Sequence, residues 1–175
     1  MRIPVFLSCP SDWNPAQSRA RKRILHELDR AALEWRSLGK TDYPTMCPLR
    51  EVLVIAKHCS GGVILGFSQF ETRGGIWKKG SHGERKERSR TLYPTPWNQL
   101  EAGILFSLSL PLLVFCESGI SGGIFDHGVT DVFVHPMPIG SMTRIESLSL
   151  REVLQKWSAK VRDHYYGGAY ANPTN

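Results

Sequence analysis

The chain has 175 residues, of which 41% are hydrophobic and 22% charged, values typical of an ordinary globular protein and not of a disordered or fibrous one. A chain of this length fits one domain with a single core. The N-terminus carries no charged-then-apolar signal pattern, and no apolar stretch approaches the length of about 20 residues that spans a bilayer. The cysteines Cys9, Cys47, Cys59 and Cys116 show neither Cys-x-x-Cys spacing nor the density of a disulfide scaffold. We therefore expect a cytoplasmic protein with reduced thiols and no membrane contact.

The net charge of +6 is unevenly distributed, because residues 71–90 carry seven Lys/Arg against three Glu. A basic chain can bind nucleic acid, but such binders interleave the charge with aromatic or groove-reading elements. Here the charge lies in one glycine-punctuated loop. The sequence therefore argues against nucleic acid as the main partner. Binding through this loop stays open as a third hypothesis, which predicts an affinity that falls steeply with salt.

The first predicted elements are a strand, a helix and a second strand. Residues Ile3–Ser8 are apolar strand formers that end at the turn Cys9–Asp12. A helix follows from Pro15 to about Arg30, with Asn14 as its N-cap. The alternation of apolar and polar residues in Leu33–Leu38 predicts a half-buried strand, and continuation of the helix through Leu38 is the alternative. The helix also carries four cations that we expect to be solvated: Arg19, Arg21, Lys22 and Arg23.

The other predicted elements follow in chain order: a loop at Gly39–Pro44, a helix from Pro48 to near Gly61, a strand at Gly62–Phe67, a helix at Trp97–Leu108, and strands at Pro111–Cys116 and Asp131–His135, then a helix at Leu150–Tyr165. Between the third strand and the next helix, Ser68–Pro94 is long, basic and rich in glycine. A loop of that length is usually functional or disordered, so we expect a lid. We expect one domain over residues 1–166 and a flexible tail over 167–175.

Strands that alternate with helices predict an α/β fold: one open, mostly parallel twisted sheet flanked by helices, a three-layer, flavodoxin-like architecture. In such sheets the carboxyl ends of the strands share one edge, and ligands bind there. The loops that follow the strands are expected at that edge. The residues that we expect to contact a ligand lie in these loops, at the end of a strand or at the start of the following helix: Ser8, Ser11, Asp12, Trp13, Asp42, Tyr43, Gly66, Trp97 and Asn98.

Glu101 is the candidate catalytic residue. It lies in an otherwise apolar helix, with no Lys or Arg three or four positions away to pair with it. An unpaired acid on the first turns of a helix that starts at the ligand edge is a candidate catalyst, whereas a surface Glu that complements the helix N-terminus is the alternative. Trp97, four residues earlier, is expected to share its face and form a stacking plate; closing the core under the basic loop is its alternative role.

Several other chemistries lack their motifs. The loop after the first strand contains neither the Gly-x-Gly-x-x-Gly motif of dinucleotide dehydrogenases nor the Gly-Lys-Ser/Thr motif of phosphate-binding loops. The sequence therefore does not support hydride transfer or nucleoside triphosphate hydrolysis. Gly119–Gly123 is either an anion-binding nest of backbone amides or a plain turn. His127 and His135 are isolated, so no metal site and no bound cofactor are expected.

Three parts of residues 3–116 resemble a known group of proteins. Val5-Phe6-Leu7-Ser8, then Val63-Ile64-Leu65-Gly66, then Trp97-x-x-x-Glu101 leading into Pro111-Leu112-Leu113-Val114 resemble the TIR domain and the related nucleoside 2-deoxyribosyltransferases. The resemblance implies that Glu101 attacks or stabilises the anomeric carbon of an N-glycoside, with NAD or a nucleoside as substrate. It also implies a role in signalling or defence and a homo-oligomer. The basic loop is longer than in these families and Glu117–His135 has no counterpart, so the substrate is not carried over.

The main alternative is a binding module. The same pocket would then sense a nucleotide, or the domain would assemble with a partner, without chemistry. Binding without turnover distinguishes this module from the enzyme.

Overall fold

The computed structural model of the protein describes residues 1–43, 45 and 47–170. At its centre is a five-stranded sheet in the order β2-β1-β3-β8-β9, in which every neighbouring pair is parallel. The strands are β1 (Ile3–Ser8), β2 (Leu33–Arg36), β3 (Gly62–Gly66), β8 (Leu112–Cys116) and β9 (Val134–Pro136). The predicted open parallel α/β sheet is confirmed.

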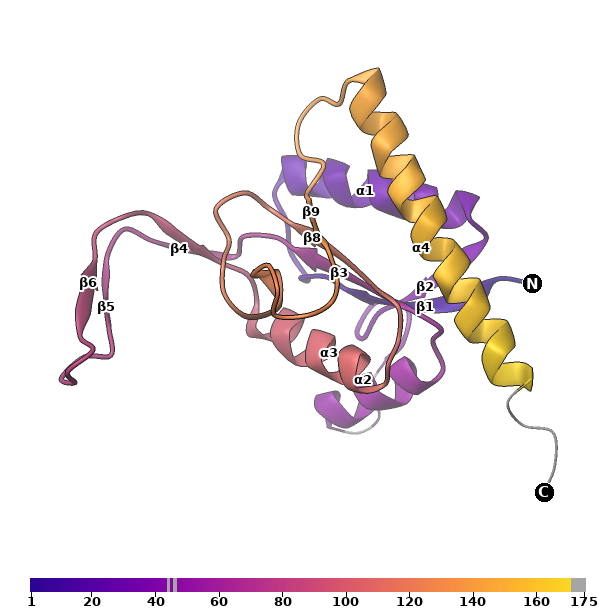
Figure 1. The fold of residues 1–175 in the computed structure, drawn as a ribbon, viewed down its shortest axis with the longest axis horizontal. Coiled ribbons are helices and arrows are strands. Elements are labelled where there is room, and N and C mark those ends of the chain that lie inside the picture. The colour runs from indigo at the N-terminus through magenta and orange to yellow at the C-terminus, as the bar shows by residue number, and fades with distance from the viewer. Residues whose placement is uncertain (44, 46, 171–175) are drawn as a thin grey trace.

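Helices cover both faces of this sheet (Figure 1). They are α1 (Pro15–Arg30), α2 (Pro48–Lys57), α3 (Pro96–Ser107) and α4 (Arg144–Tyr170). Because side chains alternate along a strand, Val5 and Leu7 of β1 pack into one apolar cluster with α1 and α4, whereas Phe6 packs into a second cluster with α2 and α3. The result is the expected three-layer arrangement.

The end of α1 decides between the two interpretations of Leu33–Leu38. The helix begins with a capping box, in which Asn14 Oδ1 accepts from Gln17 N at 2.9 Å and Gln17 Oε1 accepts from Asn14 N at 3.0 Å. It ends because Ala32 adopts the left-handed conformation, with φ of 56°. The chain then enters β2, so the alternative of a helix through Leu38 is wrong, and the strand stops at Arg36.

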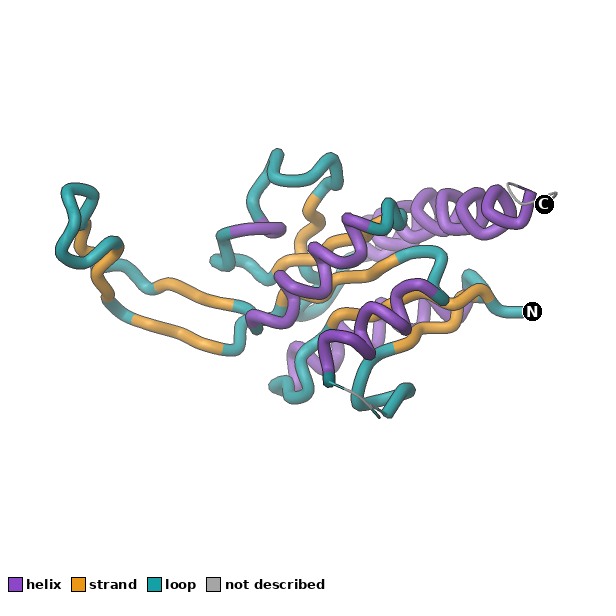
Figure 2. Tube along the Cα trace, turned by 90° about the horizontal axis from the view of Figure 1, so that it is seen from below, coloured by secondary structure: helices purple, strands orange, loops and turns teal. Residues whose placement is uncertain are grey.

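The predicted lid loop is a β-ribbon instead. Strand β4 (Phe70–Thr72) pairs antiparallel with β7 (Thr91–Tyr93), and β5 (Gly75–Trp77) pairs antiparallel with β6 (Arg85–Glu87). Figures 1 and 2 show that this ribbon projects away from the sheet and its helices. We name residues 70–93 the ribbon. It does not cover the sheet edge in this structure.

The C-terminal part departs from the prediction in its boundaries. The last helix begins at Arg144 and not at Leu150, because Thr143 caps it: Glu146 N donates to Thr143 Oγ1 at 3.2 Å, and Thr143 N donates to Glu146 Oε2 at 2.7 Å. The helix continues to Tyr170, through the expected start of the tail, and residues 171–175 lie outside the described part. The last strand is shifted to Val134–Pro136.

No helix in the described part of the chain combines the length and the apolar character needed to cross a membrane. The longest one, α4, has 27 residues but carries charged side chains along its length.

Candidate functional site

The strand order reverses direction between β1 and β3, which is the position where open α/β sheets bind ligands. From β1 the chain moves outward to β2 and then crosses back to β3 on the other side, so the connections that leave β1 and β3 diverge to opposite faces. Ser8 is the last residue of β1 and shares the face of Phe6, toward α3. Helix α3 packs against both β1 and β3. It thereby brings its own polar residues to the ligand edge of the sheet.

Hydrogen bonds connect Ser8 to Asn98 on α3, the helix that also carries Glu101. Asn98 Nδ2 donates to Ser8 Oγ at 2.8 Å, while Asn98 Oδ1 accepts from Thr95 Oγ1 at 3.1 Å. The Ser8 hydroxyl also lies close enough to the Glu101 carboxyl to lower its pKa. Since Ser8 Oγ accepts the Asn98 proton, its own proton is free to be donated to the Glu101 carboxylate. The three predicted site residues Ser8, Asn98 and Glu101 therefore form one buried unit.

Burial dominates the electrostatics of Glu101. Its side chain lies on the core-facing side of α3, only 9% exposed, so the alternative of a solvated surface Glu is wrong. Burial raises the pKa of Glu101 from 4.5 to about 7, although the hydrogen bond from Ser8 and the positive charge of Lys40 oppose the rise. The carboxyl therefore changes its charge in the neutral range, where acids that do chemistry are often tuned.

A cationic and aromatic group borders this unit. Lys40 Nζ donates to the Pro10 carbonyl at 2.7 Å and lies 4.1 Å from the centre of the Trp13 ring. The Arg21 guanidinium carbon lies 4.6 Å from the same ring centre. Burial lowers the pKa of Lys40 and raises that of the neighbouring Cys9 thiol. Trp13 thus already contacts two cations, and it holds positive charge near the sheet edge.

Lys40, Arg21 and Cys9 are the site residues that the sequence interpretation missed. Lys40 lies in the loop Gly39–Pro44, which was expected at the ligand edge of the sheet. Its position in the sequence could therefore have indicated that it belongs to the site. Arg21 was expected to be solvated on α1 and is instead half-buried against Trp13 and Trp35, at 5.4 Å from the latter ring centre. Arg23 was also expected to be solvated, but it donates to the Pro138 carbonyl at 2.8 Å, whereas Arg19 and Lys22 are exposed as expected.

The other polar residues that we expected at the site, in the loops after β1 and β2, are exposed or already form an ion pair. Ser11 and Asp12 are exposed, with Ser11 Oγ 3.5 Å from Asp12 Oδ2. Asp42 forms an ion pair with Arg36 and accepts from Thr41 Oγ1 at 2.7 Å. Tyr43 is 78% exposed. The structure therefore does not join these residues to the Ser8–Asn98–Glu101 unit.

Trp97 is exposed, so its role as a stacking plate stays a prediction, whereas Gly66 is buried against an aromatic ring. Trp97 is 42% exposed on the first turn of α3, so the alternative in which it closes the core is wrong. Gly66 is buried, and a Cβ atom there would lie 2.4 Å from Cε1 of Phe125. The absence of a side chain at Gly66 therefore admits the Phe125 ring, which gives this glycine a packing role.

Some backbone donors of the segment after β8 are already engaged. Within the glycine-rich stretch, Gly122 N donates to Asp126 Oδ1 at 2.7 Å, and Ile124 N, just after it, donates to Gln99 Oε1 at 3.0 Å. The Gly122 amide is therefore not available for the anion-binding nest, and the nest over Gly119–Gly123 otherwise stays a prediction. Glu117 Oε2 accepts from Gln17 Nε2 at 2.8 Å and from Ser68 N at 2.9 Å, which ties β8 to α1 and to the base of the ribbon.

Two further observations concern ligands. Among the described residues no group of three or more His, Cys, Asp or Glu side chains is arranged to hold a metal ion. A cavity of about 680 Å³ lies between β8, β9 and α4, lined by Leu112, His135 and Trp157 and not by Glu101. The cavity and the buried carboxyl thus mark different places. We base the candidate site on Glu101 because a perturbed acid at a strand-order switch point is the more specific sign of chemistry.

Comparison with known proteins adds no relative: no family model, no curated protein and no solved structure matches this chain. The resemblance to TIR domains and nucleoside 2-deoxyribosyltransferases therefore stays a prediction carried by short motifs.

Proposed function

We propose that the edge of the sheet at which β1 and β3 end binds a nucleotide or nucleoside, with NAD as one substrate, and that Glu101 acts on its N-glycosidic bond. In this reaction the bond between the anomeric carbon and the base nitrogen breaks, and the electron pair leaves with the base. The Glu101 carboxylate stabilises the positive charge that develops on the sugar, or captures it as a glycosyl ester. Water then adds to the anomeric carbon and gives up its proton, for which Glu101 is a suitable acceptor with a pKa of about 7.

The observation that carries the proposal is the buried unit of Ser8, Asn98 and Glu101. The three side chains are buried together at the edge where ligands of parallel sheets bind, and Asn98 is hydrogen-bonded to Ser8. A buried acid is costly to keep unless its charge is used or compensated. Lys40 and Arg21 add positive charge at the same edge, which suits the phosphates of a nucleotide. The free thiols of all four cysteines suit a cytoplasmic location, where such substrates occur.

A substrate panel tests the proposal. The protein is incubated with NAD, ribonucleosides and deoxynucleosides, each with and without a second free base as acceptor, and products are separated by chromatography. We expect free base from at least one substrate, and an exchanged nucleoside if the activity is transfer. The absence of any product at high protein concentration, with a nucleotide bound, would contradict the proposal and indicate the sensor instead.

An assembly module of the same fold is the second candidate function, and the outer face of α3 favours it. Glu101 is the only titratable residue of that helix and is buried, so the exposed face carries no charge. Three large apolar side chains lie on the exposed surface of α3, with Trp97 42%, Leu100 49% and Phe106 50% exposed. An uncharged surface of this kind suits contact with a second copy of the chain. The substrate panel is therefore run at two protein concentrations, because a catalytic homo-oligomer gains specific activity as concentration rises.

A further inference from the structure

The ribbon is an appendage that the core does not need. Neither apolar cluster of the described chain contains a residue from the stretch 73–90. Only Leu92, at the ribbon's base, is buried. An isolated pair of short antiparallel strands is marginally stable in water, so a projection of this length gains little for folding. Its composition must therefore be explained by what it contacts outside this chain.

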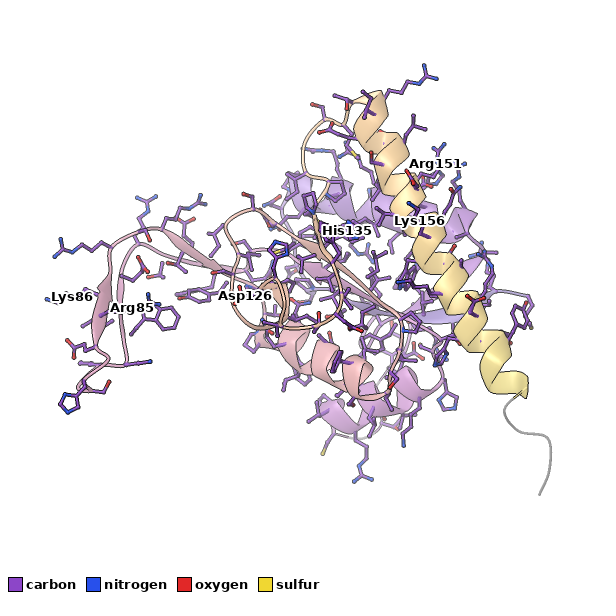
Figure 3. All side chains as sticks on the ribbon, in the orientation of Figure 1. Arg85, Lys86, Asp126, His135, Arg151 and Lys156 are labelled. Atoms are coloured by element: carbon purple, nitrogen blue, oxygen red, sulfur yellow. The ribbon has the colours of Figure 1, made fainter. Side chains whose placement is uncertain are left out.

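The ribbon carries a concentration of unpaired positive charge. Its acids are engaged locally: Glu71 pairs with Arg90 at 2.8 Å and with Arg73 at 3.5 Å, Glu84 accepts from Gly80 N, and Glu87 accepts from Ser89. Five further cations form no ion pair within the described residues: Lys78, Lys79, Arg85, Lys86 and Arg88. Figure 3 shows Arg85 and Lys86 on the outer part of the ribbon, far from the helices. The outer ribbon thus presents cations that form no ion pair with any described residue.

Both faces of the outer ribbon combine a cation with an apolar side chain. The register pairs Trp77 with Arg85 and Ile76 with Lys86, and adjacent pairs point to opposite faces. Arg85 lies 5.4 Å from the centre of the Trp77 ring. Ile76 is 46% and Trp77 39% exposed. The interleaving of charge and aromatic contact, which the sequence did not reveal, is therefore present once the segment forms strands.

We propose that the ribbon docks into the major groove of a B-form DNA duplex. That groove is about 12 Å wide and 8.5 Å deep, and it admits a two-stranded β-ribbon. Its two walls are both lined with phosphates, which matches cations on both faces and at the tip. A flat anionic surface, such as a lipid bilayer, contacts only one face of a ribbon and leaves the cations of the other face in water. The docking surface is separate from Glu101 and does not depend on the proposed reaction.

Fluorescence anisotropy with a labelled duplex of about 20 base pairs tests this proposal at salt concentrations from about 50 to 200 mM. If the five unpaired cations each neutralise one phosphate, the slope of log K against log salt is about −4.5, which corresponds to a loss of roughly 500-fold in affinity over that range. The ribbon variant changes all five cations to Gln: Lys78, Lys79, Arg85, Lys86 and Arg88. We expect this variant to lose binding and its salt slope.

The control variant removes the same number of charges from the body of the protein. It changes to Gln five exposed cations that form no ion pair in the described chain: Arg19, Lys22, Lys57, Arg144 and Lys160. A second variant replaces residues 73–90 by Asn-Gly, a two-residue turn that joins the paired Thr72 and Thr91 and keeps the base of the ribbon. We expect the control to bind DNA nearly as the wild type does and the shortened chain not to bind.

Three results would overturn the proposal. They are no binding of the duplex by the wild-type chain, equal losses in the ribbon and control variants, and binding of single-stranded DNA or of phosphatidylserine vesicles that equals or exceeds binding of the duplex. Circular dichroism of the shortened chain shows whether the rest of the protein is still folded. If it is folded, a loss of DNA affinity is assigned to the removed ribbon.

Discussion

Replacement of Glu101 by Gln is expected to lower kcat/KM for base release by about 10³-fold, equivalent to about 4 kcal/mol of transition-state stabilisation. Gln has nearly the same shape and still hydrogen-bonds Ser8, but it cannot carry the negative charge that stabilises the sugar cation. The variant therefore removes the charge and keeps the packing. Base release is followed by chromatography on the best substrate of the panel.

A matched substitution, Glu34→Gln, serves as the control for this experiment. Glu34 is an exposed acid on β2 and belongs to neither the Ser8–Asn98–Glu101 unit nor its cationic neighbours. We expect its kcat/KM to stay within about twofold of the wild type, since surface substitutions have small effects. Equal activities of the Glu101→Gln and wild-type proteins would remove Glu101 from the mechanism.

The same Glu101→Gln variant is expected to make the protein more stable at alkaline pH. Burial raises the pKa of Glu101 from 4.5 in the unfolded chain to about 7 in the folded one, so the folded state holds the proton more tightly. The stability that this proton contributes is complete below about pH 4.5 and is lost as the pH rises through about 7. Between about pH 5.5 and pH 8.5 the wild type loses about 2 kcal/mol through this group, whereas Gln does not titrate.

Urea unfolding of both proteins at these two pH values measures the effect. The quantity compared is the change in unfolding free energy between the two pH values, in the Gln variant and in the wild type. Contributions from the histidines and from other acids cancel, because both proteins contain them. We expect the gap in unfolding free energy between the Gln variant and the wild type to widen by about 2 kcal/mol toward pH 8.5. Equal pH dependences in the two proteins would show that Glu101 is not buried as an acid. The Glu34→Gln protein should follow the wild type.

The central sheet could be predicted because its strands are short apolar runs between turn residues. Val63–Leu65 and Leu112–Val114 are buried on both faces, so their patterns indicate parallel strands without knowledge of their neighbours. Glu101 could be singled out from the sequence because no other charge lies on its helix, but its burial was not predicted. The strands depend on local sequence, and the structure places them as expected.

The parts that could not be predicted depend on contacts between distant segments. Arg21 looks solvated on a helical wheel, and only the approach of Trp13 and Trp35 buries it. Asp42 looks free in its loop, and only β2 brings Arg36 to it. The ribbon strands carry charged residues at alternate and adjacent positions. They therefore lack the apolar pattern from which strands are predicted. Gly66 looked like a ligand contact at the end of its strand, because Phe125, which packs against it, is almost sixty positions away.

The pH dependence of kcat/KM for base release tests most directly whether the Glu101 carboxylate carries the reaction. The active form is the ionised one, and burial raises the pKa of this group to about 7. We therefore expect log kcat/KM to rise by one unit per pH unit below about pH 7 and to level off above it. A second, falling limb at higher pH marks the loss of the neighbouring Lys40 charge, whose pKa burial lowers. A kcat/KM that does not change with pH between about 5 and 7 would contradict the assignment of the reaction to Glu101.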